Sequence, residues 1–372
     1  MPPQLFPICV GGRTGFIDRS GAVVIQPRFG RLTFGFAQGL CRVQQEGKFG
    51  YVNTRGVVVV TPRYDWAERF SHGLAAVKVG AKWGYIDRQG NWVVRPRFDW
   101  TERFEGRCAV VKIGARYGLI DRSGRWVITP RFEWLGAFSD ERAAAKRSGK
   151  YGFIDVQGQM VIEPRYDQVW DFSEGLARVT AGARLQSSGW RGGQWWHMDK
   201  AGKTITGPFA HAYSFSAGLA AVAVDGKYGY VDRRGQLKIQ PQFDEADEFS
   251  GGLAVVGFAD RRRPKRVSPP DVDALLGHLW AIKGTVGRRG YIDRQGRWRI
   301  RARFDRAGVF CEGLAAVRLN DQWGYIDRSG KLKIRARFDE AGNFTDGLAR
   351  VRTGKKNGYI NRTGTFIWKP TA

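Results

Sequence analysis

One acidic residue recurs along the chain in a short phrase, Gly-aromatic-hydrophobic-Asp, with a glycine three residues later. A row of carboxylates suggests general acid/base catalysis or calcium binding, but both need a second acid or oxygen ligand at a set spacing. We find no such second acid, and asparagine replaces the aspartate twice, which a turn tolerates and catalysis does not. We therefore predict turn-capping roles for Asp18, Asn53, Asp87, Asp121, Asp155, Asp199, Asp232, Asp293, Asp327 and Asn361.

The other chemically capable residues form no recognisable catalytic or metal motif. The four histidines share no motif, and the sequence has neither a glycine-rich phosphate loop nor a serine or cysteine nucleophile signature. The sequence thus predicts a protein that is not an enzyme, with no catalytic residue, metal ligand or cofactor. Chemistry carried by inserted segments stays open as a third hypothesis.

The cysteines and the N-terminal residues indicate which cellular compartment the protein occupies. The four cysteines lie at no metal-ligand spacing, so we interpret them as free thiols in a reducing environment. The N-terminal residues have no basic region and no uninterrupted apolar stretch, unlike a secretory signal. No apolar run approaches the length of a membrane span. We expect a cytoplasmic protein without a transmembrane segment.

Three tryptophans are the strongest candidates for binding. Trp66, Trp100 and Trp134 occupy one place in three consecutive repeats, where other copies have glutamine, glutamate or arginine. A position that accepts charged residues is expected to be exposed, so the three would form an aromatic strip with Arg69 and Arg103 nearby. Exposed aromatics with arginine are typical of interfaces. The alternative is that local repacking buries them.

The chain is strongly basic, with a net charge of +26 from 61 Lys and Arg against 35 Asp and Glu. Arginine recurs after the acidic position and again before an aromatic residue. If repeats stack, these positions form two stripes, which would either solubilise the surface or attract nucleic acid or another polyanion. The stripes contain Arg19, Arg88, Arg122, Arg233, Arg294, Arg328 and Arg362, and Arg28, Arg63, Arg97, Arg131, Arg165, Arg303 and Arg337.

Short β-strands are expected to position all of these residues. In the third copy, residues 74–79, 82–86 and 92–94 are apolar runs bounded by glycine, and Pro96 is expected to end the last. Asp87 to Gly90 suits a type I turn followed by a left-handed glycine. Each copy is therefore a three-stranded antiparallel meander plus a connector. Phe98 and Phe104, six residues apart on that connector, are expected to be core anchors between copies.

The repeat period determines the predicted architecture. Five of the nine intervals between the acidic positions are 34 residues, and the longest is 61. We predict one all-β array over residues 1–372, an open superhelical arrangement of about ten meanders, with a closed β-propeller as the alternative. Two insertions, at about 181–194 and 257–289, should emerge on the same edge and could mark a binding face.

The second insertion combines a basic run with a predicted helix. The run holds Arg261, Arg262, Arg263, Lys265 and Arg266. A helix capped by Ser268 would follow, with apolar residues on one face. It would either pack on the protein's own sheet or dock a partner, and the basic run would be a solvated loop or a phosphate contact.

The repeated phrase resembles the bacterial WG, or KWG, repeat. Lys82-Trp83-Gly84 has the full motif, and Lys48-Phe49-Gly50, Lys150-Tyr151-Gly152, Lys227-Tyr228-Gly229 and Gln322-Trp323-Gly324 are variants. The resemblance implies a β-rich interaction module. We accordingly expect a non-enzymatic scaffold that binds a protein partner, with polyanion binding along the arginine stripes as the alternative.

Overall fold

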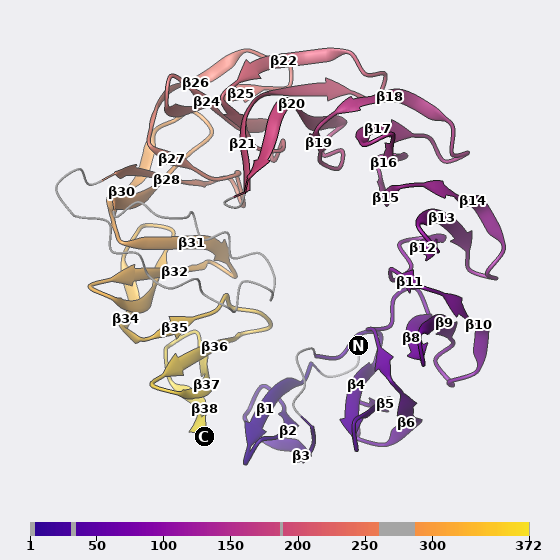
Figure 1. Cartoon of the computed structure of the whole chain (residues 1–372). Helices are drawn as coiled ribbons and strands as arrows, with labels where there is room; N and C mark the ends of the chain where they lie inside the picture. The colour runs from indigo at the N-terminus through magenta and orange to yellow at the C-terminus, as the bar shows by residue number, and fades with distance from the viewer. Residues whose placement is uncertain (1–3, 31–34, 187–188, 260–286, 372) are drawn as a thin grey trace. The chain divides into compact units, whose positions relative to one another are not determined.

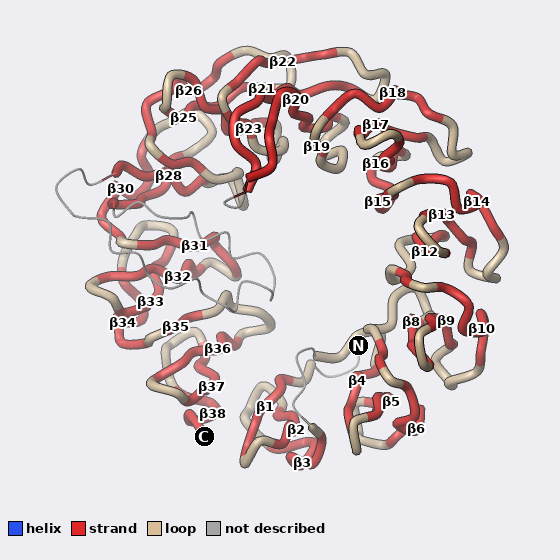
Figure 2. The backbone as a smooth tube through the Cα atoms, viewed as in Figure 1, coloured by secondary structure: helices blue, strands red, loops and turns tan. Residues whose placement is uncertain are grey.

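The computed structural model describes residues 4–30, 35–186, 189–259 and 287–371. All regular structure in these residues is β-strand (Figure 2). No helix among them has the length and apolarity to cross a membrane. The chain divides into two compact units, one up to Asp171 together with Thr371 and the other from Phe172 to Pro370.

The first unit consists of antiparallel sheets whose strands follow one another in chain order (Figure 1). Two three-stranded sheets, β1–β3 and β4–β6, precede three four-stranded sheets, β7–β10, β11–β14 and β15–β18. The strands are β1 (Phe6–Val10), β2 (Arg13–Ile17), β3 (Val23–Phe29), β4 (Leu40–Gln45), β5 (Lys48–Asn53), β6 (Val58–Tyr64), β7 (Trp66–Ala67), β8 (Ala75–Val79), β9 (Lys82–Ile86), β10 (Trp92–Phe98), β11 (Trp100–Thr101), β12 (Cys108–Ile113), β13 (Arg116–Asp121), β14 (Trp126–Phe132), β15 (Trp134–Ser139), β16 (Arg142–Arg147), β17 (Lys150–Ile154), β18 (Met160–Tyr166) and β19 (Gln168–Val169).

The second unit repeats this construction. An antiparallel meander of β20, β21 and β22 is followed by four-stranded sheets β23–β26, β27–β30, β31–β34 and β35–β38. The strands are β20 (Leu176–Gln186), β21 (Gly189–Asp199), β22 (Thr204–Phe209), β23 (His211–Ala212), β24 (Leu219–Val224), β25 (Lys227–Asp232), β26 (Leu237–Phe243), β27 (Glu245–Ala246), β28 (Ala254–Ala259), β29 (Gly287–Ile292), β30 (Trp298–Phe304), β31 (Arg306–Cys311), β32 (Leu314–Leu319), β33 (Gln322–Asp327), β34 (Leu332–Phe338), β35 (Glu340–Ala341), β36 (Leu348–Thr353), β37 (Lys356–Asn361) and β38 (Phe366–Thr371).

The predicted three-stranded meander is wrong in two respects. The connector contributes a fourth strand, such as β7, which pairs with β8 through Trp66–Lys78 and Ala67–Val77. The last strand also continues through Pro96, because β10 is an edge strand with an irregular register. Proline is tolerated there, since its missing N–H takes no bond from a ladder.

This four-stranded construction corrects the expected open superhelical array. Within each unit, successive antiparallel sheets stand as separate blades (Figure 1), which is how a β-propeller is built. The chain passes from one blade to the next through a single residue, Asp65 between β6 and β7 and Asp99 between β10 and β11. The predicted alternative, a β-propeller, is therefore the better description of the blades.

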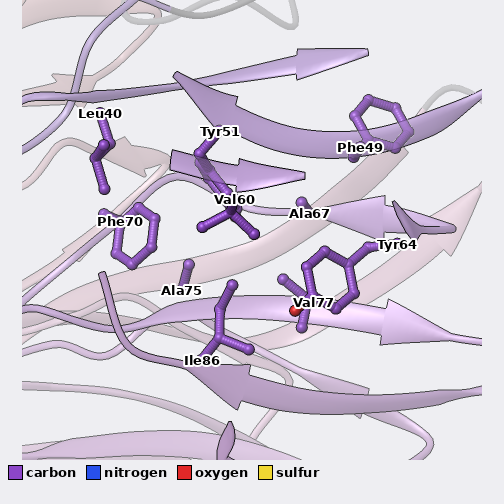
Figure 3. Close-up of a cluster of buried hydrophobic side chains, with 10 residues drawn as sticks. All are labelled: Leu40, Phe49, Tyr51, Val60, Tyr64, Ala67, Phe70, Ala75, Val77 and Ile86. Carbon is purple, nitrogen blue, oxygen red and sulfur yellow. The ribbon is translucent and has the colours of Figure 1, made fainter. Parts of the chain in front are cut away.

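The hydrophobic core lies between neighbouring blades. One cluster joins Leu40, Phe49, Tyr51, Val60 and Tyr64 of the β4–β6 blade to side chains of the next blade (Figure 3). The predicted anchor rings are confirmed, since Phe98 and Phe104 are both fully buried. The second of each pair packs edge-to-face on a tyrosine of the preceding blade, as in Tyr51–Phe70, Tyr85–Phe104, Tyr230–Phe249 and Tyr325–Phe344.

The glycine of the WG motif is required by its blade's own last strand. A Cβ atom on Gly84 would lie 2.4 Å from the carbonyl oxygen of Val94, and backbone cannot easily move aside. Equivalent approaches of 2.2–2.5 Å occur at Gly15, Gly50, Gly118, Gly152, Gly229, Gly290 and Gly324. In the β20–β22 meander Trp196 takes this position, and the facing strand carries Gly207, whose φ is +119°.

We expect Gly84→Ala to destabilise the β7–β10 blade by about 1–3 kcal/mol, the usual cost of forcing an extra methyl group into packed structure. Gly308→Ala is the matched control, because its Cβ would come no closer than 3.4 Å to any neighbour and its φ lies outside the left-handed region. Urea-dependent hydrogen exchange of the blade's amides would measure the stability of each variant. Equal stability of the two variants would contradict the packing explanation.

The predicted turn role of the aspartate row is confirmed. The Oδ1 atom of Asp87 accepts hydrogen bonds from the backbone N–H groups of Gln89 and Asn91, each at 2.9 Å. Asn53 forms the same pair of bonds at 3.0 Å. Gly90 follows with φ +88°, the predicted left-handed glycine. An amide oxygen thus replaces the carboxylate without changing the turn.

These turns make an acid-dependent contribution to stability. Hydrogen bonds from the serine two residues later lower the pKa values of Asp18, Asp121 and Asp327 below the usual range. A lowered folded-state pKa stabilises the protein above the unfolded-state pKa of about 3.9, and that contribution is lost as the pH falls through the folded-state value. The triple variant with asparagine at all three positions should lose less stability between pH 5 and pH 2 than the wild type. If the urea unfolding midpoints of the two proteins fell by the same amount between pH 5 and pH 2, this explanation would be contradicted.

A second acidic position, which the sequence analysis missed, connects neighbouring blades. The Oδ1 atom of Asp99 pairs with Lys82 Nζ of the preceding blade at 2.5 Å, and its Oδ2 atom accepts from the N–H of Gly114 at 2.6 Å. The same lysine–aspartate pair recurs as Lys48–Asp65, Lys150–Asp167 and Lys227–Asp244. The lysine of the KWG motif therefore has a structural partner 17 residues later.

Candidate functional site: a tryptophan groove in the first unit

The three predicted binding tryptophans each begin the first strand of a blade. Trp66, Trp100 and Trp134 are 41%, 37% and 36% exposed, so the alternative prediction that they are buried is wrong. One part of each indole still packs on a neighbouring ring: Phe49 for Trp66, Tyr117 for Trp100 and Tyr151 for Trp134, at centroid distances of 5.1–5.8 Å. The side chains are thus held in place while remaining accessible.

A groove of about 630 Å³ opens between the β7–β10 and β11–β14 blades. Three indoles line this tryptophan groove: Trp66, Trp100 and Trp83, the tryptophan of the WG motif itself. Its remaining lining residues are Asp65, Glu68, Lys78, Thr101, Glu102, Arg103 and Glu105. Trp134 and Arg69 do not line it, so the predicted strip of three equivalent tryptophans is corrected to a groove that includes two of them, Arg103 and one unpredicted tryptophan.

A buried arginine explains why the groove is open. Arg42 stands where most blades have alanine or valine, and its guanidinium donates to the carbonyl oxygen of Ala67 at 2.5 Å. The same guanidinium lies 5.0 Å from the Trp66 ring and 5.1 Å from the Phe49 ring. Trp66 therefore packs against the preceding blade, whereas Trp100 packs within its own. Trp83 packs against the core cluster that contains Phe98 and Phe104, and it also lines the groove.

Hydrogen bonds hold the groove walls. The Trp66 indole N–H donates to Glu68 Oε1 at 2.6 Å. On the opposite wall, Tyr85 is hydrogen-bonded to Thr101, and its hydroxyl donates to the carbonyl oxygen of Glu102 at 2.7 Å. The Tyr85–Thr101 contact is buried and the Tyr85–Glu102 contact is half-buried, so the wall that carries Trp100 is fixed to the preceding blade.

Acidic side chains dominate the charged lining of the groove. Burial, together with the nearby Glu105 and Asp171, raises the pKa of the Glu102 carboxyl. Burial and Glu105 also raise the pKa of Asp171. Arg103 lies 3.6 Å from Glu105 in an exposed ion pair. The groove thus has a local excess of carboxylates on a chain whose net charge is +26.

The predicted arginine stripes turn out to connect blades. Arginines after the aspartate position donate to a turn carbonyl 50 or 77 residues earlier: Arg88 to Gln38, Arg122 to His72, Arg328 to Gly251 and Arg362 to Glu312. Those before the aromatic position donate to a glycine carbonyl 27 or 28 residues later: Arg28 to Gly56, Arg63 to Gly90, Arg97 to Gly124, Arg131 to Gly158, Arg303 to Gly330 and Arg337 to Gly364. A carbonyl does not neutralise a guanidinium, so the positive charge persists at fixed positions.

The two predicted insertions differ in what the structure describes of them. The first lengthens the β20–β21 hairpin, in which each strand has 11 residues. The second begins after β28 and ends before β29, and its basic run, Arg261, Arg262, Arg263, Lys265 and Arg266, lies outside the described residues together with the predicted helix. The candidate site therefore rests on the blades alone.

Two histidines of the second unit are packed in its core. Burial lowers the pKa values of His197 and His211 to about 4, so both rings are uncharged near neutral pH. His197 packs edge-to-face on Phe215, and His211 packs on Trp195. Among the described residues, no group of three or more histidines, cysteines and acids could hold a metal ion.

Comparisons with known proteins agree with the blade construction. The sequence profile described as "WG containing repeat" matches residues 15–49, 49–83, 83–116, 117–151, 151–182, 198–228, 228–258, 290–323 and 323–356. No curated protein sequence matches the chain. A crystal structure of a eukaryotic initiation factor is similar in fold, with a TM-score of 0.52 and 10% identity over 98% of this chain and 99% of that one.

A second solved structure, Hsv2 of Kluyvelomyces marxianus, matches with a TM-score of 0.35 and 12% identity over 59% of this chain and 85% of that one. The repeats themselves identify the family. The nine matched segments span most of the sequence and contain the Lys-Trp-Gly positions, the turn aspartates and the anchor rings already described. This chain therefore belongs to the WG-repeat family.

Proposed function

We propose that the chain is a non-enzymatic scaffold that binds a protein partner through the tryptophan groove. The observation that carries this proposal is the convergence of three indoles, two of them more than one third exposed, on one 630 Å³ groove. Tryptophan is enriched among the residues that dominate protein–protein binding energy. Blades held together by repeated ion pairs and arginine contacts offer such a groove on a rigid support.

The preorganisation of the groove supports this proposal. Trp66 is fixed by Arg42 and Glu68, and Trp100 by Tyr117. A partner would therefore pay little conformational entropy to order these rings, because they already occupy one arrangement. An exposed aromatic surface with no such support would instead be a liability for aggregation.

The test is affinity capture from a lysate with and without nuclease, using the wild type and the Trp66→Ala, Trp100→Ala double variant. The proposal expects a protein that resists nuclease treatment, is retained saturably by the wild type, and is lost from the double variant. Retention of the same protein at equal strength by both would remove the groove as the binding site.

A second candidate function, polyanion binding, is supported by the arginine rows. Their guanidiniums are fixed by carbonyl contacts and stack on aromatic rings, as Arg63 does on Tyr64 at 5.2 Å, yet keep their charge. Binding through several such groups would weaken steeply with salt because counterions are released. A gel shift with single- and double-stranded DNA at low salt tests it, and absence of any retained band would exclude it.

We also propose that the protein acts in a reducing compartment, as in the cytoplasm. The four cysteines, all within the described residues, form no disulfide bond, and Cys41 is fully buried. Free thiols are usual where the cell keeps cysteine reduced.

A further inference from the structure

A second hollow, of about 370 Å³, lies on the other side of the wall that carries Trp100. Its lining is mainly apolar and includes Val110, Leu119 and Phe138, with Cys108, Ala137 and Val156. We call it the apolar hollow. Glu102, Arg103 and Glu105 line both this hollow and the tryptophan groove, so residues 102–105 form a ridge between the two.

The ridge is firmly held. The Phe104 side chain is 1% exposed and packs edge-to-face on Tyr85 at 4.7 Å. Its carbonyl oxygen accepts a hydrogen bond from Ser71 Oγ at 2.7 Å. A segment crossing the ridge would therefore meet two preformed depressions at a fixed separation.

The charges of the groove favour a cation. Asp65 is paired with Lys48 and Glu105 with Arg103, whereas the Glu102 carboxylate has no ion-pair partner among the described residues. Glu68 accepts the Trp66 indole N–H, and its charge interacts with that of the buried Arg42 guanidinium. Lys78 is the remaining cation in the lining, against the Glu102 carboxylate and the adjacent Asp171. Indole faces also attract cations, and tryptophan does so most strongly.

We propose that the tryptophan groove and the apolar hollow together take one extended segment of a partner protein, with a lysine or arginine side chain in the groove and an aliphatic side chain in the hollow. This inference rests on the proposed function and adds the chemistry of the bound segment. Successive side chains of an extended segment point to opposite sides, about 3.3 Å apart along the chain, so two side chains on the same side can enter both depressions while the backbone crosses the ridge. A polyanion does not fit, since the groove carries excess carboxylate.

The test uses labelled ten-residue peptides of glycine and serine that carry one arginine and one leucine, separated by one, two or three residues. The matched controls replace arginine by glutamate or leucine by serine. Cys108 serves as a reporter of the hollow: it is half-buried and lines it, and burial raises the pKa of its thiol, so alkylation is followed at pH 8.5. Cys9 and Cys311 are replaced by serine, and Cys41 is already buried.

At least one arginine–leucine peptide should bind at least tenfold more tightly than both controls and slow Cys108 alkylation. Glu102→Gln with Glu105→Gln should remove that tenfold preference for arginine over glutamate. Equal binding of the arginine and glutamate peptides, or tight binding that leaves Cys108 alkylation unchanged, would overturn the inference. If instead the tryptophan double variant retains the whole partner, it is the proposed function that fails.

Discussion

Replacing Trp66 and Trp100 together by alanine should weaken binding of the protein partner at least about a hundredfold, because central tryptophans of an interface each contribute about 2 kcal/mol or more. The two indoles stand on opposite walls of the tryptophan groove, so their joint removal leaves Trp83 alone. Neither is required for the core, since both are more than one third exposed. Titration of the captured partner by calorimetry or surface plasmon resonance would measure the loss.

Two controls make this result specific to the groove. Trp126→Ala removes an indole of equal exposure, 37%, from the edge strand β14, where it packs on Phe98. Trp134→Ala removes the third tryptophan of the sequence pattern, which lies outside the groove. Both should change the affinity by no more than about twofold, as for most interface-distant residues. A loss on Trp134→Ala as large as that of the double variant would favour a continuous strip instead.

Phe104→Ala should destabilise the blades beside the groove by about 3–5 kcal/mol, the usual cost of removing a buried phenylalanine ring. The ring is 1% exposed, packs on Tyr85 and supports the ridge that carries Glu102 and Glu105. Repeat proteins need not unfold as one cooperative body. Hydrogen exchange of β9 and β12 therefore measures the effect better than a single melting temperature.

Phe344→Ala is the matched control for stability. Phe344 is 2% exposed and packs on Tyr325 at 4.8 Å in the second unit, the counterpart of the Phe104–Tyr85 contact. It should accelerate exchange in β33 and β36 and leave β9 and the groove unchanged. The Phe104 variant should also weaken partner binding, whereas the Phe344 variant should not. The same exchange pattern in both variants would contradict the local role assigned to these rings.

Local features were predictable because each is determined by a few adjacent residues. The turn at Asp87 and Gly90 depends only on a carboxylate that accepts two nearby N–H groups and on a glycine with positive φ. The repeated phrase likewise reveals the period, and the family profile confirms the WG repeat. The anchor rings Phe98 and Phe104 follow from a spacing that only a repeated packing contact explains.

Contacts between blades were not predictable in the same way. The short strand β7 has only two residues, too few to produce an alternating pattern, so the fourth strand of this blade was missed. The groove depends on Arg42, which lies in another blade and holds Trp66 away from Trp83. The local sequence Trp-x-Glu-Arg-Phe is common to Trp66 and Trp100 and absent at Trp134, but it does not show which blade each indole packs against. The one sequence signal for this contact is that Arg42 replaces the alanine or valine that most repeats have at the same position.

The central claim, that a protein partner occupies the tryptophan groove, is tested most directly by photocrosslinking. A photoreactive phenylalanine derivative placed at Lys78, which lines the groove, should crosslink the partner. The same group at Val127, a 40% exposed residue on β14, should not. Crosslinking from residue 127 but not from residue 78 would contradict the account.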